Sequence, residues 1–149
     1  MTTQTPRRYC SGFTLIELMA AVAVVAILAT LAISSYSAYV KRANRTYATN
    51  ALVNFSQALQ RCYSQYFTFQ SPCPVATATT PTTTPDGYYS ITVSIPTTSN
   101  NSYTLTAVPV KSPQTNDTQC VTFTLLSSGQ QQATNSQGQD SSQTCWGSG

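Results

Sequence analysis

Glu17 is the residue of this sequence whose type and position point to the most specific chemistry. It is the only charged residue in the apolar run from Phe13 to Ile33, and that run is long enough to cross a membrane. A charged side chain inside such a span costs about 2.5–3.5 kcal/mol on insertion scales and usually has a functional partner. We therefore expect Glu17 to meet a positive group when the run is buried.

The residues before Glu17 complete a spaced pattern. Arg7 and Arg8 precede Gly12, Phe13 follows it, and Glu17 is the fifth residue counted from Phe13. This order of basic residues, small residue, acid and apolar run resembles the N-terminal signature of type IV pilins and of the pseudopilins of type II secretion. The resemblance covers the first third of the chain well and the remainder loosely.

The resemblance implies how the chain is processed and assembled. A prepilin peptidase would cut after Gly12 and methylate the new N-terminus at Phe13, so that residues 1–12 are a leader. An inner-membrane assembly platform would then add the chain to a filament of pilin subunits. There we expect Glu17 to pair with the α-ammonium group of Phe13 in a neighbouring subunit and to set the register. The alternative is that Glu17 extends to the lipid surface as an orienting anchor.

The apolar run also allows other targeting interpretations. An ordinary secretory signal would need cleavage near Ala29 or Ala32, which would discard Glu17 and leave it unexplained. Basic residues flank the run on both sides, so the positive-inside count does not decide the orientation. The short leader and the resemblance imply a single-pass inner-membrane protein with its N-terminus inside, which becomes extracellular in the assembled pilus.

Five cysteines are present, and Cys10 would leave with the leader. The other four lie in a segment expected outside the cytoplasm, where disulfides form. Four cysteines allow three pairings, and the sequence leaves all three open. We expect the sequential pairing, Cys62 with Cys73 and Cys120 with Cys145, and each bridge would contribute about 3 kcal/mol. A zinc site is disfavoured because the cysteines lack close spacing and no His is present.

The composition argues against an enzyme. Charged residues are only 7% of the 149 residues, and the net charge of +3 falls to +1 for residues 13–149, which carry five basic and four acidic side chains. Without His, a Ser or Cys nucleophile lacks its common base, and no glycine-rich phosphate loop is present. We therefore expect no catalytic, cofactor or metal site, and weak general attraction to nucleic acid.

One continuous helix is expected from about Phe13 to about Tyr66, because neither Gly nor Pro interrupts this stretch. Its first 21 residues are apolar all round, and Lys41, Arg42 and Arg45 are expected to mark its emergence from lipid. Its second half is amphipathic and should bury one stripe against a sheet. The stripe consists of Tyr47, Ala51, Leu52, Phe55, Leu59, Cys62, Tyr63 and Tyr66.

The segment after the helix has the pattern of a connector followed by strands. Residues 71–87 are rich in Pro and Thr, which excludes a helix or a central strand. We expect a solvated loop there, with a glycosylated or adhesive patch as the alternative. Alternation predicts strands over Tyr88–Ile95, Tyr103–Val108 and Cys120–Leu126, and a fourth near Gln130–Thr134. They would form an antiparallel sheet with one face on the helix.

The polar C-terminal segment has a second pattern. Cys120, an apolar strand, Gly129 and the pair Cys145-Trp146 follow one another. This order resembles the disulfide-closed C-terminal region of many bacterial pilins and favours a pilin over a pseudopilin. We expect Trp146 to pack over the disulfide.

Together these patterns predict an α+β pilin fold, in which one long N-terminal helix packs on a small antiparallel sheet. The expected parts are a leader (1–12), a membrane or filament-core helix (13–34) and a globular domain outside the cytoplasm (35–149). The expected function is that of a structural subunit, major or minor, of a type IV pilus used for adhesion, twitching or DNA uptake. The alternatives are a DNA-receptor pilin, with a local patch around Arg61 and Lys111, and a pseudopilin. Nucleic acid is not the favoured partner.

Overall fold

The structure is a computed structural model that describes residues 12–70, 72–75, 81–97 and 101–147, with backbone alone for 31–34. The contacts divide the chain into two compact units, one ending at Tyr36 and one, here called the globular unit, beginning at Ser37. The leader expected at residues 1–12 lies outside the described residues except for Gly12.

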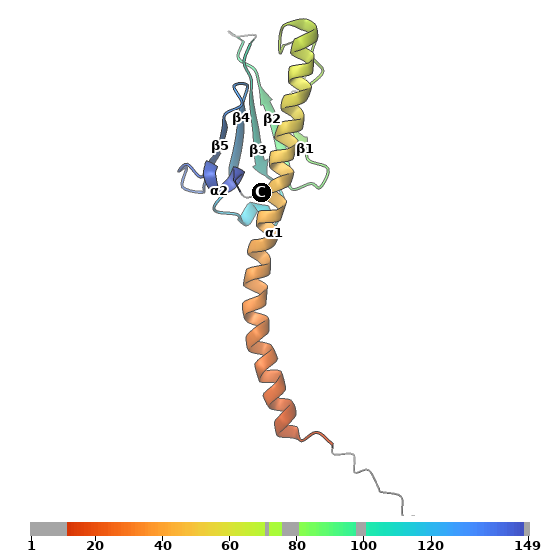
Figure 1. The fold of residues 1–149 in the computed structure, drawn as a ribbon, viewed down its shortest axis with the longest axis vertical. Coiled ribbons are helices and arrows are strands. Elements are labelled where there is room, and N and C mark those ends of the chain that lie inside the picture. Colours follow the sequence, from red (N-terminus) through yellow and green to blue (C-terminus); the bar gives the residue numbers. More distant parts are fainter. Residues whose placement is uncertain (1–11, 71, 76–80, 98–100, 148–149) are drawn as a thin grey trace, which may run out of the picture. The chain divides into compact units, whose positions relative to one another are not determined.

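Helix α1 spans Leu15–Tyr66, so it begins two residues later than expected and ends at the expected residue (Figure 1). Its 52 residues contain no Gly or Pro, so no backbone hydrogen bond is lost along it. The helix ends where Phe67 takes a left-handed backbone conformation with φ of 54°. The Phe67 N–H still bonds to the carbonyl oxygen of Tyr63 at 2.8 Å, which closes the last turn.

The sheet of the globular unit is an antiparallel meander in chain order. Strand β1 (Thr82–Thr83) pairs with β2 (Tyr89–Ser94), which pairs with β3 (Thr104–Pro109). Strand β3 pairs with β4 (Thr122–Leu126), and β4 pairs with β5 (Gln131–Thr134) (Figure 1). The predicted α+β fold is therefore confirmed. The strand β1 inside the Pro- and Thr-rich connector is an edge strand, where its pairing needs only one neighbour.

The core lies between the second half of α1 and one face of the sheet. Alternate residues of β2, β3 and β4 point toward the helix, as the period of two predicts. Burial of this apolar surface contributes about 25 cal/mol per Å² and holds the two layers together. The buried apolar side chains include Ala48, Leu52 and Leu59 of the helix, with Phe69, Tyr89, Ile91, Tyr103, Leu105, Ala107, Phe123, Leu125 and Ala133.

The buried stripe of the helix differs from the predicted one at its edges. Tyr47 and Tyr66 are 46% and 50% exposed, whereas Ala48 is fully buried. Spacings of four and seven residues align Ala48 with Leu52 and Leu52 with Leu59, so these small and branched side chains face the sheet. Tyr47 precedes Ala48 by one residue and therefore lies beside that line. Tyr66 follows Leu59 by seven residues and continues the line, but it is the last residue of the helix and stays half-exposed.

Besides β1, which lies where a loop was predicted, two more short elements were not expected from the sequence. The β3–β4 connection contains a 3₁₀ turn, η1 (Gln114–Asn116), and the polar tail ends in helix α2 (Ser142–Trp146). The tail places Ala133 and Cys145 in the core, while most of its other side chains remain accessible. The tail is therefore held by few apolar contacts, one disulfide and hydrogen bonds.

Candidate functional site

The start of helix α1 carries a reciprocal hydrogen-bonded cap. Gly12 and Phe13 precede the helix and are exposed. The Glu17 N–H donates to Thr14 Oγ1 at 3.3 Å, and the Thr14 N–H donates to Glu17 Oε2 at 3.4 Å. This is the capping box, in which an N-cap hydroxyl and an acid three residues later satisfy each other's backbone groups. This role of Glu17 was not among the predictions, although the Thr-x-x-Glu spacing signals it.

The surface around Glu17 is apolar and open. Between Leu15 and Leu28, the large hydrophobic side chains are 56% to 77% exposed. Helix α1 is long and apolar enough to cross a membrane by length and composition, with a mean hydropathy of 2.6 over its most apolar window. Contiguous exposed surface of this kind marks contact with lipid or with another apolar partner. The pairing of Glu17 with a neighbouring Phe13 stays a prediction.

A buried ion pair joins helix α1 to the loop that follows η1. Arg45 and Asp117 are 5% and 3% exposed. Arg45 Nε lies 2.8 Å from Asp117 Oδ2 and Arg45 Nη2 lies 3.0 Å from Oδ1, a bidentate arrangement that combines charge with fixed geometry. Arg45 Nη2 also donates to Gln119 Oε1 at 3.0 Å. Buried charges of this kind are tolerated only when paired and hydrogen-bonded.

The burial of Arg45 corrects the expectation that it marks the emergence from lipid. Arg45 precedes Ala48 by three residues and Leu52 by seven, and this helical spacing puts it on the buried stripe. The same spacing could have identified it from the sequence. Lys41 and Arg42 are largely accessible, and Lys41 Nζ donates to the carbonyl oxygen of Asn116 at 2.9 Å.

A second set of polar contacts continues this attachment into the core. Gln114 is fully buried and donates from Nε2 to the Tyr89 hydroxyl at 2.7 Å and to the Lys41 carbonyl at 3.1 Å. Asn44 Nδ2 donates to Gln114 Oε1 at 3.3 Å. Burial raises the pKa of the Tyr89 hydroxyl from 10.0 to about 12, because a phenolate would lose its hydration there. The β3–β4 connection is thus tied to the helix through charges and amides.

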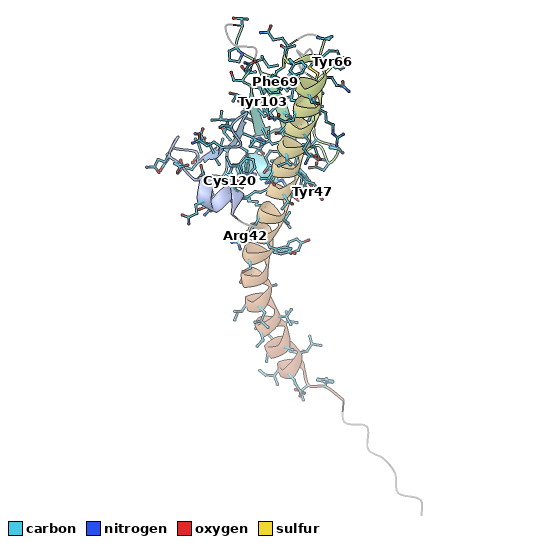
Figure 2. The ribbon with its side chains drawn as sticks, turned by 45° about the horizontal axis from the view of Figure 1, so that its top comes forward. Arg42, Tyr47, Tyr66, Phe69, Tyr103 and Cys120 are labelled. Carbon is cyan, nitrogen blue, oxygen red and sulfur yellow. A yellow bond between two sulfur atoms is a disulfide. The ribbon has the colours of Figure 1, made fainter. Side chains whose placement is uncertain are left out.

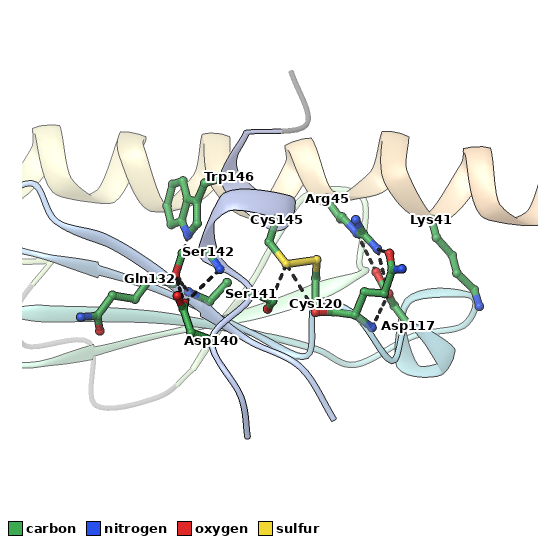
Figure 3. The surroundings of a disulfide bond; sticks show 12 residues. Lys41, Arg45, Asp117, Cys120, Gln132, Asp140, Ser141, Ser142, Cys145 and Trp146 are labelled. Carbon is green, nitrogen blue, oxygen red and sulfur yellow. Dashed lines mark hydrogen bonds and ion pairs between the residues drawn. A yellow bond between two sulfur atoms is a disulfide. The ribbon is translucent and has the colours of Figure 1, made fainter. Parts of the chain in front are cut away.

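The structure joins Cys120 to Cys145 beside this ion pair (Figure 3). Cys145 is in helix α2, and Cys120 lies just before β4, so the bridge ties the tail to the sheet. Trp146 meets Phe123 edge-on with ring centroids 6.1 Å apart, and its Nε1 donates to the Gln132 carbonyl at 2.8 Å. The ring was expected over the disulfide, and it packs against the core cluster that contains both cysteines and Phe123.

The second disulfide joins Cys62 to Cys73 at the far end of helix α1. This is again the sequential pairing that the sequence analysis favoured among three. Cys62 is 7% exposed and Cys73 is fully buried. The bridge encloses the helix end and the turn after it, which includes Phe67 and Phe69.

The patch suggested by Arg61 and Lys111 does not form. Lys111 Nζ lies 5.5 Å from the ring centroid of Tyr88, and Tyr88 stacks on Tyr47 at 6.3 Å. Arg61 follows Tyr47 by fourteen residues, which is about 21 Å along an α-helix. The two basic side chains therefore belong to opposite ends of the globular unit, and Lys111 is engaged with an aromatic face.

A polar hollow of about 440 Å³ lies along strand β5. Its lining includes Gln130, Gln132, Thr134, Asp140 and Ser142. Hydrogen bonds from Ser142 hold the pKa of the Asp140 carboxyl below its ordinary value. Within the described ranges, no three His, Cys, Asp or Glu side chains are grouped to hold a metal ion. The hollow offers hydrogen bonds and one carboxylate, without a nucleophile–base pair.

Comparison with known proteins identifies two matching family models. Residues 7–33 match the prokaryotic N-terminal methylation motif. Residues 34–124, more than half of the chain, match the family described as type IV minor pilin ComP, DNA uptake sequence receptor. No curated protein matches the chain. With its N-terminal methylation motif and its long helix on an antiparallel sheet, the chain belongs to the type IV minor pilin ComP family.

Proposed function

We infer that this protein is a minor subunit of a type IV pilus that binds DNA for uptake. The observation that carries the inference is the family match over residues 34–124, because it covers most of the chain beyond the methylation motif. The sequence alone favoured a pilin of general function and ranked DNA reception second. The family match supports placing DNA reception first.

The N-terminal segment supports the filament part of the proposal. Cleavage after Gly12 would create a charged amine on Phe13 and remove Arg7 and Arg8, which could not enter an apolar filament core. Residues 13–34 would span the inner membrane before assembly and pack against other subunits afterwards. Glu17 would then pair with the Phe13 amine of a neighbour, since a buried carboxylate needs a compensating charge.

The capping box allows a sharp test of this charge pairing. Gln can replace Glu in a capping box, whereas Val cannot accept the Thr14 N–H. If Glu17 acts through its charge, both Glu17→Gln and Glu17→Val are lost from sheared surface fibres. If its role is limited to capping, Glu17→Gln is incorporated normally and the register role is refuted. Membrane levels of each variant, measured by immunoblotting, control for stability.

Processing is tested separately at Gly12. A bulky residue there, as in Gly12→Leu, is expected to block the cut, so the full-length precursor accumulates in the membrane. Mass spectrometry of the intact chain reports its first residue. A Gly12→Leu protein that begins at Phe13 would contradict the assigned cut site.

DNA binding is tested with the processed full-length chain in detergent micelles and fluorescently labelled random-sequence duplexes. We expect the anisotropy of the labelled duplex to rise on binding, and the rise to weaken with added salt. Cells that lack this protein but still assemble pili should lose natural transformation. Absence of binding at low salt together with unchanged transformation would remove the receptor role and leave a structural pilin. Sequence preference is measured by selecting bound duplexes from the random pool and sequencing them.

A further inference from the structure

Phe67 is unusual both in its exposure and in its backbone conformation. It is 76% exposed, and its φ of 54° is a conformation that bulky side chains rarely adopt. Gly or Asn ordinarily occupies this position after a helix, because a Cβ atom is strained there. The chain therefore holds a large aromatic ring in water at a site where Gly would be more stable. Strain of this kind is common at binding sites.

The ring of Phe67 is supported from behind by a continuous aromatic series. Phe67 meets Tyr63 edge-on at 6.5 Å, and Tyr63 stacks on Phe69 at 4.6 Å. Phe69 meets Tyr103 edge-on at 4.8 Å, and these two rings are 4% and 2% exposed. Figure 2 shows Phe69 and Tyr103 beside the end of the helix that carries Tyr66. Because the Cys62–Cys73 bridge also encloses this turn, Phe67 projects from a rigid support.

The strand register shows which end of the sheet Phe67 occupies. Residue Thr104 pairs with both Ser94 and Leu126, so these residues mark one end. The Tyr103 hydroxyl is hydrogen-bonded to Ser56 at 2.8 Å and to Gln60 at 3.3 Å, which brings that end to the last turns of α1. We call it the tip. The opposite end, called the base, contains the Tyr89–Pro109 and Thr122–Thr134 pairs.

Carboxylates are distributed unequally between the tip and the base. Among the described residues of the globular unit, all three carboxylates belong to the base. Asp86 bonds to the Tyr88 N–H, Asp117 pairs with Arg45, and Asp140 bridges to Thr134. The exposed Arg61 belongs to the last turns of the helix. In the described part of the tip, no carboxylate would therefore repel a polyanion such as DNA.

We propose that Phe67, flanked by the half-exposed Tyr66, is a wedge that inserts into a base step of duplex DNA. The proposal rests on the DNA-receptor function above. Apolar wedges that partly unstack a base step are a recurring device of proteins that bind duplex DNA through the minor groove. A nearly neutral receptor cannot rely on phosphate contacts, so stacking supplies the affinity that charge does not.

The test uses the processed full-length chain in detergent micelles with labelled random-sequence duplexes. Phe67→Gly removes the ring and relieves the strained backbone, so it should remain folded, which circular dichroism verifies. We expect about a tenfold or larger loss of affinity for Phe67→Gly and for Phe67→Ala. Phe67→Tyr keeps a stacking face and should bind within about twofold of the wild type. Duplexes that contain 2-aminopurine should brighten with the wild type and not with Phe67→Gly.

The salt dependence of the DNA affinity distinguishes binding through Phe67 at the tip from binding through phosphate contacts at the base of the sheet. One phosphate contact through Arg61 predicts a log–log slope of about −0.9, whereas contacts through Lys41, Arg42 and Lys111 predict about −2.7. Equal affinity of Phe67→Gly and wild type overturns the wedge while leaving the receptor function in place. Impaired pilus incorporation of Phe67→Gly with unchanged DNA affinity also overturns it, in favour of a protein contact. A wild-type chain that binds no duplex overturns both proposals.

Discussion

The base and the tip of the sheet attach to helix α1 through different chemistry. At the base, the paired charges of Arg45 and Asp117 and the amide of Gln114 join the helix to the β3–β4 connection. At the tip, stacked aromatic rings from Tyr63 to Tyr103 fill the space between helix and sheet. Each end has its own disulfide.

This difference indicates which end of the sheet tolerates substitution of a side chain with the smaller loss of packing. Bidentate ion pairs and buried amides need fixed partners, so removal of one partner leaves an unsatisfied group in the core. Ring contacts have broader geometry, and a change at their exposed end leaves the inner rings packed. The base is therefore built for rigid attachment, and the tip can carry an exposed binding side chain.

The largest predicted effect is at the base. Arg45→Ala leaves Asp117 buried without its charge partner and should lower the free energy of unfolding by about 3–5 kcal/mol. Arg42 is on the same helix but is exposed, so Arg42→Ala should change the free energy of unfolding by less than about 0.5 kcal/mol. Denaturant unfolding followed by Trp146 fluorescence measures both, since Trp146 is the only Trp in the chain. A similar loss for both variants would mean that the ion pair has no special weight.

The disulfide at the base should contribute more to the free energy of unfolding than the disulfide at the tip. Cys120 and Cys145 are separated by 25 residues, against 11 for Cys62 and Cys73. Replacing either pair by Ser should cost about 2–5 kcal/mol, and the loop-length term makes the base bridge stronger by about 0.7 kcal/mol. Thermal unfolding of the two double variants gives the comparison. A weaker base bridge would show that loop entropy does not govern the difference.

The base should also titrate at high pH. The pKa of Tyr89 is about 12 in the folded chain against 10.0 as its ordinary value. As the pH rises, the Tyr89 hydroxyl therefore loses its proton first in the unfolded chain. Its contribution to the free energy of unfolding is fully present below pH 10 and is lost between pH 10 and about 12, by roughly 2–3 kcal/mol. Unfolding measured across this interval tests the slope, with Tyr89→Phe as the control that lacks this contribution. An identical pH dependence in both proteins would contradict the shift.

The smallest predicted effect is at the tip and has the opposite sign. Phe67→Gly relieves a left-handed conformation that costs a non-Gly residue about 1–2 kcal/mol, and part of this is offset by the greater chain entropy of Gly. We expect a net gain of about 0.5 kcal/mol in the free energy of unfolding. A clear loss would show that the Phe67–Tyr63 contact outweighs the strain. Phe67→Ala, which keeps the strain, is the matched comparison.

Much of this organisation follows from sequence pattern. The absence of Gly and Pro predicts one uninterrupted helix, because only those residues would interrupt it strongly. The amphipathic stripe, whose last member is Tyr66, predicts where the helix ends. Period-two alternation predicts β2, β3 and β4 and the side chains that face the helix. The short β1 and α2 escaped prediction because two to five residues carry too little periodicity to separate them from loops.

The sequence by itself determined the apolar N-terminal segment with Glu17, the long helix and the main strands of the sheet, because these depend on local composition and period. Only the tertiary structure decided that Arg45 meets Asp117, which is 72 residues away along the chain. It alone placed the carboxylates at the base and Phe67 at the tip with a left-handed backbone. Long-range pairing and exposure depend on how layers pack, and packing brings together residues whose separation no local pattern encodes.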